Sequence, residues 1–189
     1  MSARLSPTER YLRQRALAKA AQFGTPRHLS ALRRLVEASS YFGPDRAPAC
    51  AYARYMLALE LEVRKQMGES RAWALAAGTL ELDAECPSAE IQSYVAQAWE
   101  QKDPVLARSF AKRAVDCAPV NGAASVCYRL ILGRIALRLR DKEELRVQVN
   151  QIELTLAQLR VGSRARVEIE EHLTKFRKAL TDPPRSLEM

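Results

Sequence analysis

Glycine and aromatic residues are scarce in this chain of 189 residues, which has seven glycines and an aromatic share of 6%. A β-sandwich or β-barrel needs many tight turns, and such turns draw heavily on glycine, so the composition argues against both folds. Hydrophobic residues make up 48% and charged residues 28%, which is typical of a globular protein. Alanine, leucine, arginine and glutamate dominate, and these residues form helices readily. We therefore expect an all-α fold.

Paired metal-binding residues are also missing. None of the four cysteines lies in a CxxC pair, and only two histidines are available to complete a zinc site. We interpret the cysteines as free, buried thiols that pack like small hydrophobic residues; they are Cys50, Cys86, Cys117 and Cys127. No metal site and no cofactor are expected.

Long apolar runs are absent, and the N-terminal stretch MSARLSPTER lacks the apolar core of a signal peptide. We therefore expect no membrane span. Free cysteines without a signal peptide are typical of the reducing cytoplasm, which is the compartment that we expect.

Positive charge is in excess and unevenly spread. The formal net charge is +8, and residues 1–47 hold nine basic against three acidic residues, a net charge of +6. Residues 48–128 carry a net charge of −2, and residues 129–189 carry +4. The basic ends have two interpretations. They are either helix faces kept soluble by charge and i,i+4 pairing, or surfaces that attract an acidic protein or a nucleic acid.

Helix start and stop signals divide the chain into about nine helices joined by short loops. The tetrad from Ser6 to Glu9 is a capping box with proline at the first helical position. Asp103, followed by proline, opens a later helix in the same way, and Asp141 caps another. Gly68 is expected to break a long helix. Because short loops make neighbouring helices antiparallel, we expect stacked helical hairpins.

Apolar residues recur at helical spacing in several of these segments. The first helix carries a stripe formed by Leu12, Ala16, Ala20 and Phe23. The helix after Asp141 has a seam with steps of four and three, formed by Leu145, Val149, Ile152, Leu156 and Leu159. The clearest linker lies between residues 43 and 48. It separates a basic helical pair (1–47) from the central helices (48–160), which are followed by a capping helix and polar tail (161–189).

The central helices contain a repeated pattern. Three trios with steps of four and then three follow successive loops, and their first residues are 35 and 38 positions apart. The trios are Ala72, Ala76 and Thr79; Ala107, Ala111 and Ala114; and Leu145, Val149 and Ile152. A hairpin cannot bury its apolar face alone, so three or more such units would stack into a curved array.

The small residues Ala107, Ala111 and Ala114, with the terminal Pro119, resemble the second helix of a tetratricopeptide repeat. Gly133 and Ala136 are similar to the small positions of a first helix in that family. The resemblance covers about residues 50–160 and implies a right-handed solenoid of helix–turn–helix units that binds another protein. An ordinary helical bundle with small core residues is the alternative.

Catalytic motifs are absent from the sequence. It contains no GxGxxG, no phosphate-binding GxxxxGK[ST] and no GxSxG. His28 and His172 are expected to be surface residues, and the paired glutamates at 143–144 and 170–171 are expected to be charges on helix faces. We therefore expect no catalytic residue and no enzyme activity.

The resemblance implies a concave groove lined by the first helix of each hairpin. The partner-binding positions expected from it are Arg54, Leu57, Leu61, Arg64, Gln92, Ala96, Trp99, Leu130, Arg134 and Arg138. An apolar floor with arginines around it suits an acidic amphipathic segment of a partner protein, because arginine forks match carboxylates. The expected roles are those of an adaptor, a secretion-type chaperone or an assembly factor.

Two alternatives stay open. Basic residues cluster near the N-terminus and could bind nucleic acid; they are Arg10, Arg13, Arg15, Lys19, Arg27, Arg33 and Arg34. The exposed ends of the array, or the seam that begins at Leu145, could instead bury against a second copy and form a homodimer.

Overall fold

The computed structural model describes residues 5–42, 46–82, 87–119, 123–158 and 163–181. Within these ranges the chain forms nine α-helices and no strand, which confirms the all-α prediction. The helices are α1 (Pro7–Ala20), α2 (Pro26–Ser39), α3 (Ala47–Val63), α4 (Met67–Thr79), α5 (Ala89–Trp99), α6 (Pro104–Cys117), α7 (Ala123–Arg138), α8 (Lys142–Gln158) and α9 (Ser163–Thr181).

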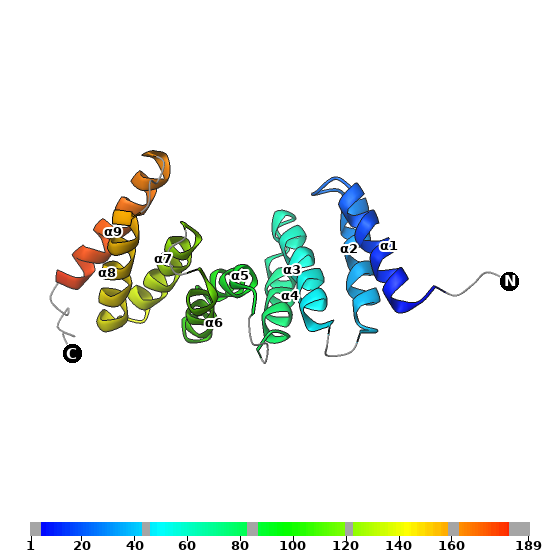
Figure 1. Ribbon diagram of the computed structural model, residues 1–189, viewed down its shortest axis with the longest axis horizontal. Coiled ribbons are helices and arrows are strands. Elements are labelled where there is room, and N and C mark those ends of the chain that lie inside the picture. Colours follow the sequence, from blue (N-terminus) through cyan, green and yellow to red (C-terminus); the bar gives the residue numbers. More distant parts are fainter. Residues whose placement is uncertain (1–4, 43–45, 83–86, 120–122, 159–162, 182–189) are drawn as a thin grey trace.

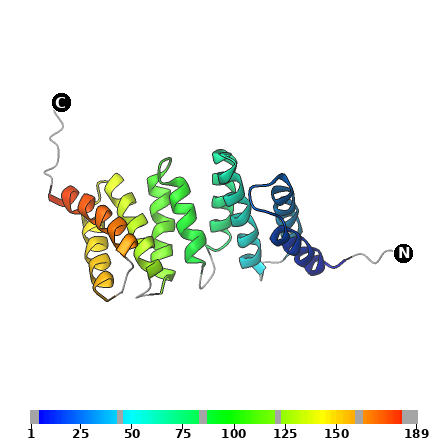
Figure 2. The ribbon, with the colours of Figure 1, turned by 90° about the horizontal axis from the view of Figure 1, so that it is seen from above.

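The helices form a single row of hairpins that runs from α1 at one end to α9 at the other (Figures 1 and 2). Each odd-numbered helix from α1 to α7 packs against the even-numbered helix that follows it, and each even-numbered helix then packs against the next hairpin. The stack of helical hairpins expected from the short loops is therefore present. The termini lie at opposite ends of the row (Figure 1).

The odd-numbered helices lie on a common face of this row. In addition to the packing of consecutive helices, α3 packs on α5, α5 on α7, and α7 on α9. From α3 to α9, odd-numbered helices of successive hairpins therefore approach one another directly. In a curved stack of hairpins the helices that approach most closely line the inner side. We call this side the odd-helix face.

Capping signals from the sequence act as expected. The backbone N–H of Ser6 donates to Glu9 Oε2 at 2.7 Å, and the Glu9 N–H donates to Ser6 Oγ at 3.2 Å, which completes the capping box. Asp103 accepts from the Leu106 N–H at 2.9 Å, and Asp141 accepts from the Glu144 N–H at 3.0 Å. These side chains satisfy N–H groups that have no partner within their own helix.

The turn between α3 and α4 differs from the prediction. Gly68 lies inside α4, and α3 ends at Val63. The chain reverses at Lys65, which has a φ of 60°. Arg140, between α7 and α8, has a φ of 56° and the equivalent role. The prediction at Gly68 was wrong because a basic residue, and not the nearest glycine, adopts the left-handed conformation.

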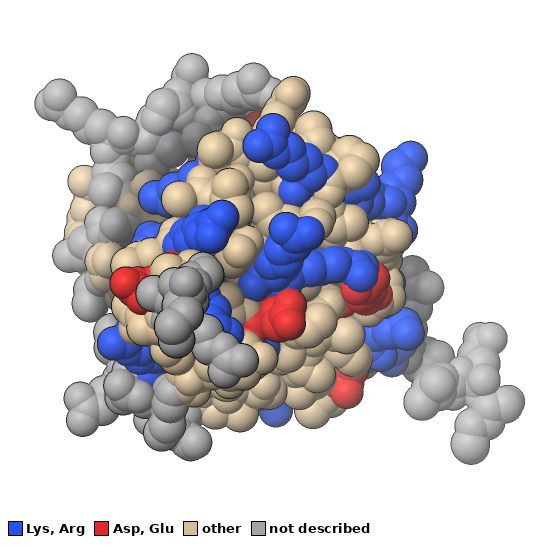
Figure 3. Space-filling model, turned by 90° about the vertical axis from the view of Figure 1, so that its right-hand side faces the viewer, with Lys and Arg blue, Asp and Glu red and all other residues tan. Residues whose placement is uncertain are grey.

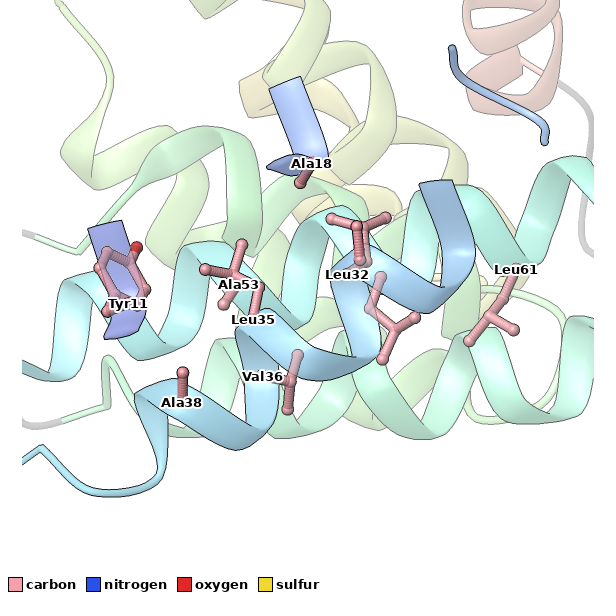
Figure 4. Close-up of a cluster of buried hydrophobic side chains, with 10 residues drawn as sticks. Tyr11, Ala18, Leu32, Leu35, Val36, Ala38, Ala53 and Leu61 are labelled. Carbon is pink, nitrogen blue, oxygen red and sulfur yellow. The ribbon is translucent and has the colours of Figure 1, made fainter. Parts of the chain in front are cut away.

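The core at the N-terminal end joins α1, α2 and α3 (Figure 4). From α1 it takes Tyr11 and Ala18, which are 6% exposed. The apolar stripe expected on α1 does not pack: Leu12 is 54% exposed, and Phe23, which lies beyond the end of the helix, is 49% exposed. An end helix has a neighbour on one side only, so the side that packs is set by the chain connection to α2.

Two of the three repeat trios are buried as expected. Ala107, Ala111 and Ala114 are at most 1% exposed, and the trio that begins at Leu145 lies in the C-terminal core. The α4 trio is displaced, since Ala72 and Thr79 are exposed. α4 packs instead through the residues Ser70, Ala74, Ala77 and Gly78.

Gly133 marks a close approach of α7 to α9. A Cβ at this position would lie 2.6 Å from the Cε2 atom of Phe176, whose ring is 1% exposed. A side chain larger than hydrogen would therefore displace a buried aromatic ring. Gly133, expected from the sequence to be a small residue at a helix contact, does allow close packing of two helices.

Candidate functional site

The odd-helix face carries a cluster of tyrosines and glutamates where α3, α5 and α7 meet. We call it the tyrosine–glutamate band. It consists of Tyr52, Tyr55 and Glu62 on α3, Glu90 and Tyr94 on α5, and Tyr128 on α7. The rings of Tyr55 and Tyr94 meet edge-on with centroids 5.3 Å apart, and Tyr52 lies 6.4 Å from Tyr55.

Two reciprocal hydrogen bonds tie α3 to α5 within the band. The hydroxyl of Tyr55 donates to Glu90 Oε1 at 2.8 Å. The hydroxyl of Tyr94 donates to Glu62 Oε2 at 2.7 Å and also lies 3.2 Å from Ser70 Oγ. These bonds fix both carboxylates at the junction of the two helices.

The environment of the tyrosines raises their pKa values. Burial, followed by the hydrogen bond to Glu90, raises the pKa of Tyr55. Burial also raises the pKa of Tyr94, to which the hydrogen bond to Glu62 adds. The pKa of Tyr128 is raised by burial and then by the charge of Glu90. All three phenols therefore remain neutral hydrogen-bond donors near pH 7.

Next to this band, α3 presents an apolar stripe. Tyr52, Met56, Leu59 and Val63 recur with steps of four, three and four residues, which places them on one side of the helix. Tyr52 is 40% exposed and Val63 is 55% exposed, while Met56 and Leu59 are half-buried. The stripe differs from the other exposed apolar side chains of the described residues because it lies beside the tyrosine–glutamate band, on the face where α3 packs on α5.

Five of the ten residues expected in the groove are buried within the chain. These are Leu57, Leu61, Gln92, Ala96 and Leu130, which are between 0% and 9% exposed. Leu57 and Leu61 belong to the core with α1 and α2. The prediction chose helices that do share one face. On α3, however, the predicted groove residues Leu57 and Leu61 point toward α2.

Arg64, another expected groove residue, belongs to a buried polar network. Its Nε donates to Glu60 Oε1 at 2.9 Å, and His28 Nδ1 lies 2.7 Å from Glu60 Oε2. The Gly24 N–H also donates to this carboxylate at 2.9 Å. His28 is 5% exposed, so the expectation that it lies on the surface was wrong. The buried carboxylate attracts it because a charge inside a protein needs partners.

Arg134 and Arg138 are also paired. Both donate to Glu100, at 2.8 Å from Arg134 and 3.3 Å from Arg138. Glu100 is only 8% exposed, so this pair of bonds ties α7 to the end of α5. Replacing both arginines with alanine would leave a buried carboxylate without a cation and would test folding as much as binding.

The two remaining groove residues also have partners within the chain. The Trp99 indole N–H donates to the Arg71 carbonyl at 3.3 Å. Arg54 donates to the Cys50 carbonyl in its own helix at 3.2 Å. Both side chains are half-buried.

All seven basic residues of the alternative nucleic-acid patch are exposed. Arg10, Arg13, Arg15 and Lys19 lie on α1, and Arg27, Arg33 and Arg34 lie on α2. Figure 3 views this end of the row, where basic side chains outnumber acidic ones. Among the described residues, Arg33 pairs with Glu69 at 3.0 Å, and the other six form no ion pair. A shallow depression of about 440 Å³ on this end includes Arg33, Arg34, Glu37 and Arg64 in its lining.

Cysteines and histidines do not assemble into a metal site in the described ranges. Cys50 is buried and donates to the Ser39 carbonyl at 3.1 Å, as expected of a structural thiol. Cys127 is exposed, contrary to the expectation. Cys86 lies outside the described residues.

Neither the tyrosine–glutamate band nor the α3 stripe was predicted from the sequence. The stripe has a clear signal in the sequence, since its steps of four and three match the pattern used for other helices. The band has no such signal, because its hydrogen bonds join residues 32 and 35 positions apart.

Comparisons with known proteins add no relative. The sequence matches no protein-family model, and no curated protein matches it either. The likeness to the tetratricopeptide repeat therefore rests on the spacing of small residues and on the stacked hairpins.

Proposed function

We propose that this protein is a non-enzymatic scaffold that binds a segment of another protein along the odd-helix face. An adaptor, a chaperone or an assembly factor would use such a surface. The carrying observation is the exposed apolar stripe on α3, in which Tyr52 is 40% and Val63 is 55% exposed. A partner helix or extended segment placed along this stripe would bury it.

The stripe lies beside a rigid support. The hydrogen bonds between α3 and α5 and the ion pairs between α5 and α7 hold the three helices together. A binding surface on packed helices needs little reordering when a partner arrives, which reduces the entropic cost of binding.

Site-specific photo-crosslinking tests this proposal. A photoreactive residue at Val63, on α3, is compared with one at Val105, a slightly more accessible valine on α6 that is 63% exposed. Cells that express each variant are irradiated. The extract made from them is then divided, and one half is treated with nuclease. We expect a discrete, nuclease-resistant protein adduct at Val63 and none at Val105.

The outcome that overturns the proposal is equally specific. Equal adducts at both positions, or none at Val63, would mean that the stripe is no docking surface. The variants are first compared with the unmodified chain by circular dichroism, so that a misfolded protein is not scored.

Nucleic-acid binding through the N-terminal end is the second candidate. It is favoured by the seven exposed basic residues on α1 and α2, six of which pair with no described acidic residue. Nucleic-acid binding of this kind weakens steeply as salt rises, because bound counterions are released from the phosphates. A complex that is lost with nuclease and with salt would support this candidate over the first.

A further inference from the structure

Two carboxylates on the odd-helix face lack a positive partner. Glu62 and Glu90 are both exposed, and each accepts one tyrosine hydroxyl. Neither takes part in an ion pair with any described residue, although the chain carries a net charge of +8. A cation placed against either carboxylate would therefore find an oxygen with no hydrogen-bond partner among the described residues.

Three of the four arginines expected in the groove are already paired with carboxylates, while Arg54 donates, among the described residues, only to a backbone carbonyl of its own helix. Arg64 pairs with Glu60, and Arg134 and Arg138 share Glu100. An acidic partner would have to compete with these two internal carboxylates, both of which are buried. The two exposed carboxylates Glu62 and Glu90 outnumber the half-buried Arg54, so the charge left unpaired on α3 and α5 is net negative. This is the opposite of what the arginine-rich sequence predicts for this face.

We infer that the partner segment is a basic amphipathic helix, whose apolar side lies on the α3 stripe and whose lysines or arginines reach Glu62 and Glu90. This inference rests on the proposed function and specifies the chemistry of the partner. A helix fits because the stripe recurs with the same steps of three and four residues that an opposing helix presents.

The tyrosines add to the recognition of a cation. Tyr52 is 40% exposed and lies 6.4 Å from Tyr55, so a guanidinium or ammonium group above this part of α3 meets an aromatic face near Glu90. A cation over a tyrosine ring is attracted by its π electrons, and a carboxylate alongside adds a charge-assisted hydrogen bond. The exposed part of the tyrosine–glutamate band supplies both groups.

Two peptide probes test the sign of the charge. Each is a helix-forming peptide of about 18 residues, long enough to be partly helical in water. Both share one leucine stripe, and they carry either lysines or glutamates on the remaining positions. Binding to the full chain is measured by fluorescence anisotropy at about 150 mM salt, where long-range attraction to the net charge is screened.

The key variant is E62Q/E90Q. Glutamine keeps a carbonyl oxygen to accept the tyrosine hydroxyl, so the α3–α5 hydrogen bonds survive while the charge is lost. The control variant E143Q/E171Q removes two exposed carboxylates on α8 and α9, away from the band. Thermal unfolding followed by circular dichroism checks that both variants fold.

We expect the lysine peptide to bind the unmodified chain and the glutamate peptide to bind it more weakly. E62Q/E90Q should weaken lysine-peptide binding by about tenfold or more, and E143Q/E171Q should leave it unchanged. Tighter binding of the glutamate peptide, no binding of the lysine peptide, or an equal loss in both variants would overturn the inference.

The two proposals fail separately. A protein adduct at Val63 that forms equally well in E62Q/E90Q would leave the scaffold function standing and remove the basic partner. Absence of the Val63 adduct removes the scaffold function itself, whatever the peptides do.

Discussion

Glu60 and Glu81 are buried glutamates whose pKa values are shifted in opposite directions. Burial raises the pKa of Glu60, but the hydrogen bonds from Gly24, His28 and Arg64 outweigh it, so the pKa lies below its ordinary value of 4.5. Glu81 is 3% exposed, and burial raises its pKa above that value despite hydrogen bonds from Gln92 and Ser88. The number of donors differs: the Glu60 carboxylate accepts from Gly24, His28 and Arg64, whereas Glu81 accepts, among the described residues, only from Gln92 and Ser88.

The raised pKa of Glu81 predicts that E81Q is more stable than the unmodified chain at pH 7. A carboxyl whose pKa is raised by folding contributes stability below its ordinary pKa and loses it as the pH rises through the raised value. Glutamine avoids that loss and still accepts from the Ser88 N–H. Urea unfolding should show a higher free energy of unfolding for E81Q at pH 7 and no advantage at about pH 4.

E60Q serves as the matched control, with the opposite sign. The lowered pKa of Glu60 means that its contribution is present above the ordinary value and is lost as the pH falls through the folded one. We expect E60Q to be less stable by about 2 kcal/mol at pH 7, with a smaller deficit in acid. If the change in the free energy of unfolding varied with pH in the same direction for E81Q and E60Q, the opposite pKa shifts of the two glutamates would be contradicted.

Single elements show how closely helix signals in the sequence correspond to the structure. The capping residues at Ser6, Asp103 and Asp141 act as expected, because a cap depends only on residues within one turn. The reversals at Lys65 and Arg140 were not predicted. There the Gln66 N–H donates to the Leu61 carbonyl, and the Asp141 N–H donates to the Ala136 carbonyl, each at 2.9 Å. This hydrogen bond closes a helix end whichever residue stands before it.

Glycine at these reversals should stabilise the protein. Lys65 and Arg140 have φ values of 60° and 56°, a region that is unfavourable for residues with a Cβ atom. Since both side chains are exposed, K65G and R140G should each raise the free energy of unfolding by about 1 kcal/mol. Urea unfolding at pH 7 measures the change.

The converse substitution is the control for this prediction. Gly24 has a φ of 82° and no atom within 4 Å of an added Cβ, so G24A tests the conformation without a clash. It should lower the free energy of unfolding. If K65G, R140G and G24A all had the same free energy of unfolding as the unmodified chain, the positive φ values would cost no stability.

The whole molecule is an open row of hairpins, in contrast to the compact bundle that the sequence left as an alternative. Its hydrophobic clusters follow one another along the row, from α1–α3 through the central helices to α7–α9. Each hairpin therefore contacts mainly its neighbours, as in other stacked repeats.

The extended shape predicts a large radius of gyration in solution. A compact globule of this length would have a radius of about 16 Å. Small-angle X-ray scattering should give a clearly larger value for the monomer and an asymmetric distance distribution. A value near that of the globule would mean that the helices collapse into a bundle.

The sequence by itself determined the number of helices seen in the described residues, the caps at Ser6, Asp103 and Asp141, and the buried seam of α8 that begins at Leu145. These features depend on residues three and four positions apart, which the chain order fixes. The helices that share a face could also be anticipated, because short loops alternate their direction.

Only the tertiary structure decided which side of each helix meets solvent. The α1 stripe is exposed and the α3 residues Leu57 and Leu61 are buried, although both sets have helical spacing. Burial depends on which neighbours cover a helix, and the bonds of Glu60, Glu62, Glu90 and Glu100 join residues that lie more than 30 positions apart. The sign of the charge left on the odd-helix face follows from those distant pairings, so no local pattern could have revealed it.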